Sequence, residues 1–239
     1  MLVVRLIIGV YRMGGIKAII FDAYGTLYDV QGTMGQKFND VFPGKGESIR
    51  EIWRAKYHEY NLFRSVTNQY KDFWKVTNDA LTYALKHLKI EASDSTGQEI
   101  LEQYFQVKPF DHVAEGLSAL NSYNKMILSN GTLEMLNKMI INSGLQEHFL
   151  YIVSSDEVSN YKPSMTVYEL ARSKLSLNKD EILFVSSNAW DAAAAKIYGF
   201  KVCWLNRRNA VFEELDGKPD HEVKDLSELA GILHLLSNH

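Results

Sequence analysis

The chain has 239 residues, of which 46% are hydrophobic and 23% are charged, and its formal net charge at pH 7 is -3. This length accommodates one sizeable core domain with a smaller insertion, and the composition is that of a soluble globular enzyme rather than a disordered chain. The weak net charge gives no argument for nucleic acid or an anionic membrane as a partner.

Residues 1–15 are expected to be an N-terminal extension ahead of the folded core. The first ten residues are apolar apart from Arg5, as in a secretory leader, but the charge interrupts the run and no small-residue cleavage site follows. Met13 is an alternative start of the chain. No run is long enough to span a bilayer, and the single cysteine, Cys203, excludes an intrachain disulfide. We therefore expect a cytoplasmic protein, with Cys203 as a buried structural thiol rather than a nucleophile.

Residues 17–21 form an apolar, β-branched run that stops at Asp22 and is followed by Gly25 and Thr26. This pattern is typical of a buried parallel strand whose carboxyl end opens into a loop. Ligands bind at that edge of an open α/β sheet, so Asp22 is a candidate nucleophile or metal ligand. From this stretch alone, a helix cap or turn aspartate is the structural alternative.

Residues 31–107 are predicted to form an all-helical insertion. Glycines and a proline make residues 29–46 a loop or short helix that leads away from the sheet. Apolar residues then recur at helical spacing in three stretches, near residues 49–60, 74–88 and 100–105. The aromatic side chains of these stretches are expected to pack mainly within a bundle, with some facing a cleft.

Beyond Pro109, helices and strands alternate. The expected strands are 125–129, 151–153, 182–185 and 201–205, and the expected helices are 112–123, 133–143, 164–175, 192–198 and 226–236. This order predicts a Rossmann-like, doubly wound parallel sheet of the α/β class. The core domain would comprise residues 16–30 and 108–239, with the helical cap domain of residues 31–107 inserted after the first strand.

Three of the predicted strands end in polar residues, and a parallel sheet places those ends along one edge. Asp22 follows the first strand, Ser129 and Asn130 close the second, and residues 186–191 follow the fourth. Lys162 precedes a helix and would carry an ammonium to the same edge, where it would keep Asp22 ionised, as a nucleophile requires. In isolation, Lys162 is a typical solvated surface lysine.

Four motifs occur in a definite order along the chain. They are Asp-x-Tyr-Gly-Thr, Leu-Ser-Asn-Gly-Thr, Tyr-Lys-Pro and Ser-Ser-Asn-Ala-Trp-Asp. In this order they resemble the haloacid dehalogenase superfamily, over nearly the whole chain from about residue 16. The stretches FDAYGTLYDV, WRAKYHEY, YKP followed by VYELA, and FVSSNAWDA resemble in particular its L-2-haloacid dehalogenase (type II) subgroup. The resemblance also implies a homodimer.

Tyr24 distinguishes the chain from the phosphatases of that superfamily, in which a second aspartate at this position protonates the leaving alkoxide. A halide leaves without a proton, so the absence of the acid is harmless for dehalogenation and damaging for phosphate esters. The loop that supplies magnesium ligands in the phosphatases here has Ser186, Ser187 and Asn188 before Asp191, which is short of the oxygen anions that hard cations prefer. We therefore expect a reaction that uses no metal and no cofactor.

The resemblance implies a two-step displacement on a short L-2-haloalkanoic acid. Asp22 would attack the halogen-bearing carbon and expel the halide, and water would then hydrolyse the Asp22 ester to release a D-2-hydroxy acid. Arg54 would hold the departing halide or the substrate carboxylate, a role that suits a guanidinium. The helix pattern alone makes Arg54 a surface arginine.

The remaining roles are also implied by the resemblance. Residues that would hold the Asp22 carboxylate are Thr26, Lys162, Ser186 and Asn188. Asp191 would activate water. Asn130 would join Arg54 at the halide, and Ser129 would bind the substrate carboxylate. Tyr24 and Trp190 would form an apolar wall, and Tyr168 would pack or hydrogen-bond at the site, although its helix pattern alone indicates a core residue.

Two other functions compete with this interpretation. A magnesium-dependent small-molecule phosphatase of the same superfamily is the enzymatic alternative, and Tyr24 and the carboxylate-poor loop argue against it. A non-catalytic binding or assembly protein that retains the fold is the other. Such a protein has little physical need for polar groups that converge at one sheet edge.

Overall fold

The computed structural model describes residues 15–237, so the expected N-terminal extension lies, except for Gly15, outside the described residues. Within this range a parallel sheet has the strand order β3-β2-β1-β4-β5-β6. The strands are β1 (Ala18–Phe21), β2 (Asn124–Ser129), β3 (Tyr151–Ser154), β4 (Ile182–Ser186), β5 (Lys201–Leu205) and β6 (His221–Val223). The order reverses between β1 and β4, which is where open α/β sheets bind ligands. The predicted Rossmann-like fold is confirmed.

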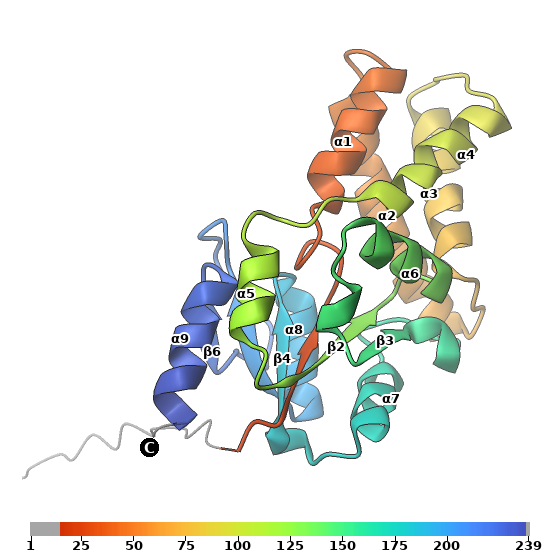
Figure 1. Ribbon diagram of the computed structural model, residues 1–239. Helices are drawn as coiled ribbons and strands as arrows, with labels where there is room; N and C mark the ends of the chain where they lie inside the picture. The colour runs from red at the N-terminus through yellow and green to blue at the C-terminus, as the bar shows by residue number, and fades with distance from the viewer. Residues whose placement is uncertain (1–14, 238–239) are drawn as a thin grey trace, which may run out of the picture.

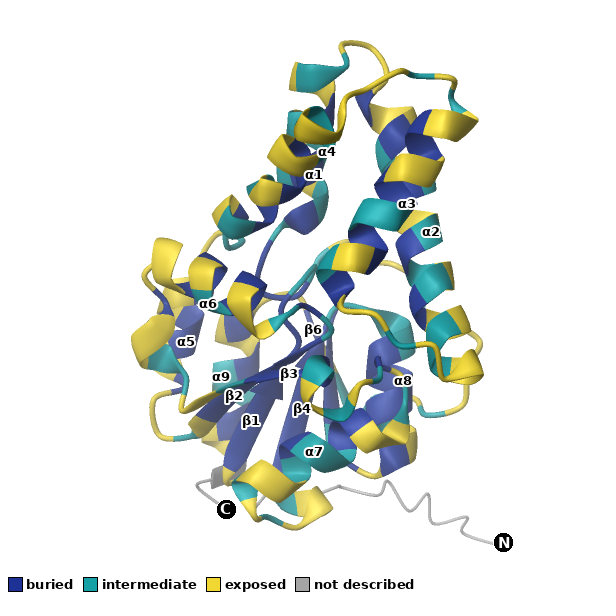
Figure 2. Ribbon diagram, turned by 90° about the vertical axis from the view of Figure 1, so that its right-hand side faces the viewer, coloured by how far each residue is buried: buried dark blue, intermediate teal, exposed yellow. Residues whose placement is uncertain are grey.

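Side chains alternate between the two faces of β1, and helices cover both faces. Ile19 and Phe21 pack on the side of α5 (Val113–Ala119), α6 (Leu133–Asn142) and α9 (Leu226–Ser237). Ile20 packs on the side of α7 (Met165–Leu175) and α8 (Ala189–Tyr198). Figure 2 shows the buried strands between these two helical layers. Burial on both faces explains why the strand is apolar throughout, as is typical of parallel sheets.

Four helices gather beyond the carboxyl ends of the strands (Figure 1). They are α1 (Val30–Val41), α2 (Gly46–Thr67), α3 (Phe73–His87) and α4 (Asp94–Glu102), and a 3-10 turn at Gln103–Gln106 follows them. The long helix α2 packs against α1 and α3. It buries Ile49, Trp53 and Tyr57 at four-residue spacing, and the indole of Trp53 donates to the carbonyl of Thr77 at 3.1 Å.

Two elements differ from the sequence-based expectations. The stretch from residue 30, expected to be a loop or short helix, is the twelve-residue helix α1. The carboxylate of Asp29 caps it by accepting from the amide of Gly32 at 2.9 Å, and α1 buries Val30, Met34 and Phe38, so two internal glycines are tolerated. The short strand β6 was not expected, because three residues with an exposed Glu222 carry no recognisable period.

The chain passes between the sheet and the four helices at two adjacent points. The amide of Asp29 donates to the carbonyl of Lys108 at 2.9 Å, and the amide of Phe110 donates to the carbonyl of Leu27, also at 2.9 Å. We call these two paired segments, residues 27–29 and 108–110, the seam. The entry and the exit of the helical part therefore lie side by side.

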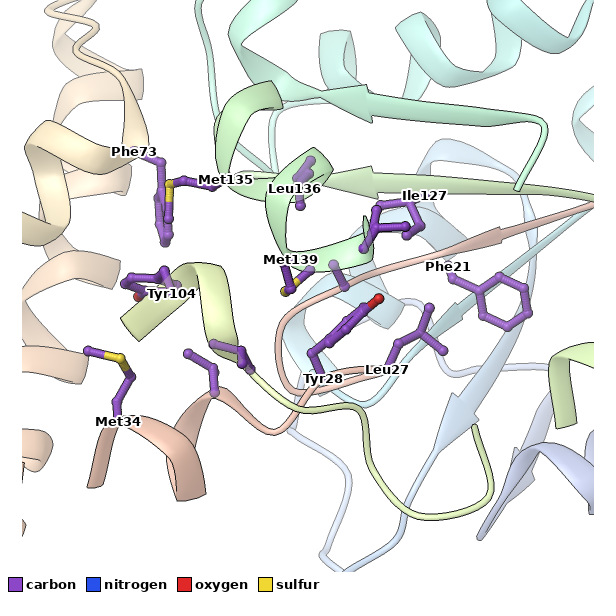
Figure 3. Close-up of a cluster of buried hydrophobic side chains, with 14 of the residues drawn as sticks. Phe21, Leu27, Tyr28, Met34, Phe73, Tyr104, Ile127, Met135, Leu136 and Met139 are labelled. Carbon is purple, nitrogen blue, oxygen red and sulfur yellow. The ribbon is translucent and has the colours of Figure 1, made fainter. Parts of the chain in front are cut away.

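One hydrophobic core continues across the seam. Figure 3 shows it extending from Phe21 and Ile127 of the sheet, past Leu136 of α6, to Phe73 and Tyr104 of the helical part. Burial of this continuous apolar cluster stabilises the helices against the sheet edge. Within residues 15–237, no helix has both the length and the apolar character that crossing a membrane requires.

Candidate active site

Asp22 follows β1 and is only 4% exposed. Its Oδ1 accepts from the ammonium of Lys162 at 2.8 Å. Its Oδ2 accepts from the hydroxyl of Thr26 at 2.8 Å and from the side-chain amide of Asn188 at 2.9 Å. Gly25 makes this turn with a φ of 83°, a conformation that glycine adopts without strain. Three donors from three segments thus hold the carboxylate in one orientation.

The ammonium of Lys162 lies between two buried carboxylates. It donates to Asp22 at 2.8 Å, to Oδ2 of Asp191 at 2.7 Å and to the carbonyl of Leu128 at 3.1 Å, so all three of its protons have acceptors. Burial disfavours the charged ammonium, but the adjacent carboxylates of Asp191 and Asp22 outweigh this effect and raise the pKa of Lys162. Lys162 is therefore a fixed buried cation and not a surface lysine.

Asp191, in the first turn of α8, is fully buried. Its Oδ1 accepts from the phenol of Tyr168 at 2.7 Å, and its Oδ2 also accepts from the hydroxyl of Ser186 at 3.2 Å. Burial raises the pKa of Asp191 to about 6, against the opposing charge of Lys162 and with a further contribution from Asp22. A carboxyl with this pKa is ionised near neutral pH and still basic enough to accept a proton.

Three predicted residues make contacts that differ from those expected. Ser186 contacts Asp191 rather than Asp22, because it ends β4 directly below α8. Tyr168 also contacts Asp191 and does not line the cavity, so it is placed to position a side chain and not to touch substrate. The amide of Asn130 is engaged with the backbone of Lys162, accepting from its N–H at 2.7 Å and donating to its carbonyl at 3.3 Å.

A cavity of about 190 Å³ lies beside Asp22, between the strand ends and the helical part. Ser129, Asn130, Lys162 and Asn188 line it from the sheet edge. Its apolar wall includes Trp190 and Tyr24, whose ring lies 6.1 Å from that of Phe73 and 5.3 Å from that of Tyr104. The buried hydroxyl of Tyr24 has no hydrogen-bond partner among the described residues.

Helix α2 presents one face to the cavity. Arg54, Tyr57, His58 and Asn61, spaced as neighbours on a helix, all line it, whereas sequence reasoning identified only Arg54. Residues three, four and seven positions after Arg54 lie on the same face of a helix, and this spacing could have identified Tyr57, His58 and Asn61 from the sequence. Arg54 is exposed and forms no ion pair within the described part of the chain. Burial, followed by the charge of Arg54, lowers the pKa of His58 to about 4.

Arg207 and Arg208, which follow β5, also line the cavity and were not predicted. Their position just after a predicted strand could have identified them in the sequence, by the same rule that identified Asp22. With Arg54 and Lys162, they give the cavity four cationic side chains. Such a lining suits an anionic ligand of small size.

The carboxylates of the site do not fit a divalent metal. Among residues 15–237, no group of three or more histidine, cysteine, aspartate or glutamate side chains is arranged to hold a metal ion. Asp22 and Asp191 share the ammonium of Lys162, which lies where a cation between them would lie. Mg²⁺ prefers several oxygen ligands in octahedral geometry, and this donor set does not supply them.

The chain belongs to the haloacid dehalogenase-like hydrolases, since the model of this family matches residues 16–199. Within that family it is similar to (S)-2-haloacid dehalogenases. It is 40% identical over 223 residues to one from Pseudomonas putida, a match that covers 92% of this chain and 98% of that protein. It is 41% identical over 216 residues to one from Pseudomonas sp. strain YL, covering 90% of this chain and 93% of that protein.

A solved structure gives the same result. The L-2-haloacid dehalogenase from Xanthobacter autotrophicus, with chloropropionic acid covalently bound, matches with a TM-score of 0.88 and 33% sequence identity. The match covers 92% of this chain and 98% of that one. The resemblance drawn from the four motifs is confirmed.

Proposed function

We propose that the protein hydrolyses short L-2-haloalkanoic acids to D-2-hydroxy acids through an ester on Asp22 and without a metal. The observation that carries this proposal is Asp22 itself, a carboxylate held by three donors at the wall of a small cationic cavity, with Tyr24 two residues further on in place of an acid. The similarity to (S)-2-haloacid dehalogenases supports hydrolytic dehalogenation of 2-haloacids.

In the first step, a carboxylate oxygen of Asp22 forms a bond to C2 of the substrate as the carbon–halogen bond breaks. The halide leaves with the bonding electron pair and needs no proton, and C2 is inverted. Thr26, Asn188 and Lys162 keep the nucleophile aimed at the cavity. The covalent chloropropionic acid in the Xanthobacter structure supports an ester in this chain.

In the second step, water attacks the carbonyl carbon of the Asp22 ester, and the bond from that carbon to the substrate oxygen breaks. Asp191 accepts a proton from the attacking water, for which its pKa of about 6 is suitable, and returns it to the departing alkoxide oxygen, which becomes the hydroxyl of the product. Asp191 does not line the cavity, whereas Lys162 does. Water therefore has to enter next to Lys162, and the uncharged ester favours this because Lys162 then retains only one carboxylate partner.

Anion binding is assigned to the opposite walls of the cavity. Arg54 on α2 has no ion pair of its own within residues 15–237 and is available for the departing halide. Ser129, at the end of β2, is buried and lines the cavity beside Asn130, where it can bind the substrate carboxylate. The aromatic wall that contains Tyr24 and Trp190 limits water around the attacking carboxylate.

A single turnover in water labelled with oxygen-18 tests the ester. With enzyme in excess over L-2-chloropropionate, the label should appear in the carboxylate of the peptide that contains Asp22, because water attacks the ester carbonyl. The peptide that contains Asp191, from the same digest, is the internal control and should remain unlabelled. Label found only in lactate would show direct attack of water on C2 and would exclude the ester.

The phosphatase alternative is tested in parallel. Halide release from L-2-chloropropionate in the presence of a chelator is compared with phosphate release from an aryl phosphate in the presence of Mg²⁺. We expect halide release that the chelator does not reduce, because the Asp22–Lys162–Asp191 set lacks magnesium ligands. Phosphate release without halide release would overturn the proposal.

We also propose that the enzyme acts in the cytoplasm as a homodimer. The free, buried thiol of Cys203 is compatible with a reducing compartment, and burial raises its pKa to about 12, so it remains a thiol. Light scattering coupled to size-exclusion chromatography measures the oligomeric state. A monomeric mass at micromolar concentration would contradict the dimer.

A further inference from the structure

Arg207 lies two residues after β5 and lines the same cavity as Asp22. One of its guanidinium nitrogens, Nη1, donates to the hydroxyl of Ser187 at 3.1 Å, and the guanidinium lies 4.3 Å from the ring centroid of Phe110. No ion pair to Arg207 is found within residues 15–237. It is thus a half-buried cation on the cavity wall with no carboxylate partner.

A short chain of hydrogen bonds connects Arg207 to the proposed nucleophile. The amide of Ser187 donates to the hydroxyl of Thr26 at 2.8 Å, and that hydroxyl donates to Asp22 at 2.8 Å. The guanidinium and the attacking carboxylate are therefore fixed to the same loop, residues 186–188 after β4. A substrate whose C2 lies at Asp22 can extend a second group toward Arg207 without leaving the cavity.

The dehalogenation of a monocarboxylic acid, as proposed above, assigns no role to the guanidinium of Arg207. Lys162 is neutralised by Asp22 and Asp191, and Arg54 is assigned to the halide. Two nearby acids, Asp225 and Asp29, favour the charged form of Arg207, but neither forms an ion pair with it. The carboxylate of Asp225 accepts from the backbone N–H groups of Ser227 and Glu228, and that of Asp29 caps α1 through the backbone N–H of Gly32. Burial lowers the pKa of Arg207 only to about 10, so the side chain is a cation at neutral pH.

The cavity is larger than a short haloacid needs. An apolar cavity of about 150 Å³ takes benzene, which has six heavy atoms, and 2-chloropropionate also has six. The cavity here measures about 190 Å³ and includes the exposed residues Arg208 and Ala210 in its lining, so it opens to solvent on the side of Arg207. The second carboxylate of a longer substrate would therefore lie at this open side of the cavity, next to a guanidinium that has no ion pair.

We infer that Arg207 binds a second carboxylate of the substrate, so that the enzyme also accepts S-configured 2-halodicarboxylic acids such as 2-chlorosuccinate. This inference rests on the proposed function, because C2 of the dicarboxylate reacts at Asp22 as described above. A guanidinium binds a carboxylate through two parallel hydrogen bonds, and a half-buried one does so with more energy than a fully solvated one. Arg207 is then a specificity-determining residue and takes no part in bond breaking.

The test compares kcat and KM for (S)-2-chlorosuccinate and (S)-2-chloropropionate in the wild type and in three variants. Arg207→Gln should lower kcat/KM for chlorosuccinate by about 10- to 100-fold, mainly through KM, which corresponds to one lost charge-assisted hydrogen-bonded pair. The loss for chloropropionate should be at least about 10-fold smaller, because this substrate has no second carboxylate for Arg207 to bind. Arg207→Lys should restore part of the chlorosuccinate activity, since it restores the charge. Lys86→Gln removes the same charge from the exposed surface of α3 and should leave kcat/KM unchanged for both substrates.

The outcomes separate this inference from the proposed function. Equal losses on both substrates would overturn it, because Arg207 would then act through Ser187 and Thr26 on the nucleophile or bind the carboxylate that all substrates share. A wild type that dehalogenates chloropropionate but not chlorosuccinate would overturn it alone. A folded wild type with no halide release from either acid would overturn the proposed function, and this inference with it. Circular dichroism spectra of all variants confirm that each is folded.

Discussion

The phenol of Tyr168 donates a hydrogen bond of 2.7 Å to Oδ1 of Asp191, and both side chains are fully buried. Burial raises the pKa of Tyr168 well above its usual value, so the phenol remains a donor in neutral solution. The hydrogen bond favours the ionised carboxylate and opposes part of the effect of burial, which sets the pKa of Asp191 at about 6. A residue of α7 thus tunes a residue of α8.

Tyr168→Phe should move the acidic limb of the pH–activity profile to higher pH. The wild type should lose activity as the pH falls through about 6, because protonated Asp191 cannot accept a proton from water. Removing a donor to the ionised form raises the pKa of Asp191, by about 0.5 to 1 pH unit if the hydrogen bond contributes about 1 kcal/mol. Because Asp191 acts in the second step, kcat is measured as steady-state halide release over many turnovers between about pH 5 and pH 8.

Tyr198→Phe is the matched control for that measurement. The ring of Tyr198 lies 5.9 Å from that of Tyr168, but its hydroxyl donates to Glu169 and not to Asp191. The acidic limb of the pH–activity profile of Tyr198→Phe should coincide with that of the wild type. An acidic limb that stays in place in Tyr168→Phe would show that the base is a group other than Asp191.

Asp22→Asn should abolish turnover while the protein remains folded. The substitution preserves the size of the side chain but removes the nucleophilic oxygen, and loss of a nucleophile costs at least about 10³-fold in rate. Asp29→Asn removes a carboxylate from the wall of the same cavity and retains a side chain that caps α1, so it should retain activity. Halide release and thermal unfolding are measured for both. Normal turnover in Asp22→Asn would exclude Asp22 as the nucleophile.

Arg54→Gln should lower kcat by about 100-fold or more, because a guanidinium that binds the departing halide stabilises charge that develops in the transition state. Lys56→Gln, two residues away on α2, removes the same charge from an exposed ion pair with Glu59 at 2.7 Å. Exposed ion pairs contribute little to stability, so this control should leave kcat and folding nearly unchanged. A similar small effect of both substitutions would place the halide elsewhere.

His58→Leu should make the protein less sensitive to acid. The pKa of His58 is about 4 in the fold, because of burial and then Arg54, and about 6.5 in an unfolded chain. The unfolded chain therefore binds more protons between these values, and the contribution of His58 to stability is lost as the pH falls from about 6.5 toward 4. For this partly exposed ring, the loss between pH 7 and pH 5 amounts to about 1 to 2 kcal/mol.

Urea unfolding of wild type and His58→Leu at these two pH values checks the sign. The difference between the two proteins is the relevant quantity, because protonation of Asp191 has the opposite effect. The pKa of Asp191 is raised to about 6, so the fold binds its proton more tightly and gains stability as the pH falls. Parallel pH dependences in the two proteins would show that His58 titrates normally.

The sheet and half of the site were predictable because strand ends are easily recognised in sequence. Burial on both faces makes β1 and β4 continuous apolar runs, and the polar residue that stops each run marks its carboxyl end. One rule about parallel sheets then brings Asp22 and Asp191 to a common edge, and the structure places them on one ammonium. This inference needed no knowledge of side-chain orientation.

The face of the cavity formed by the helical part was harder to predict. Tyr57 and Asn61 belong to the same helical stripe that buries Trp53, and sequence spacing does not distinguish a side chain packed in a bundle from one that faces a cavity. The contacts of Ser186 and Tyr168 were missed for another reason. Ser186 was expected to hold Asp22, and Tyr168 was expected to pack or hydrogen-bond at the site with no partner named, whereas both contact Asp191. The partner of each hydroxyl depends on side-chain geometry that sequence does not give.

The seam has a consequence for how such an enzyme can diversify. Because the helical part leaves and rejoins the sheet through hydrogen-bonded neighbours at residues 27–29 and 108–110, its two ends are already closed into a loop. Domains whose ends lie together can be inserted, lengthened or exchanged with little disturbance to the host fold. The proposed nucleophile and the residues that hold it follow the strands of the sheet, whereas the helical part adds a separate face of the cavity, formed by Arg54, Tyr57, His58 and Asn61 of α2. Selection can therefore change what the protein accepts without altering how it reacts.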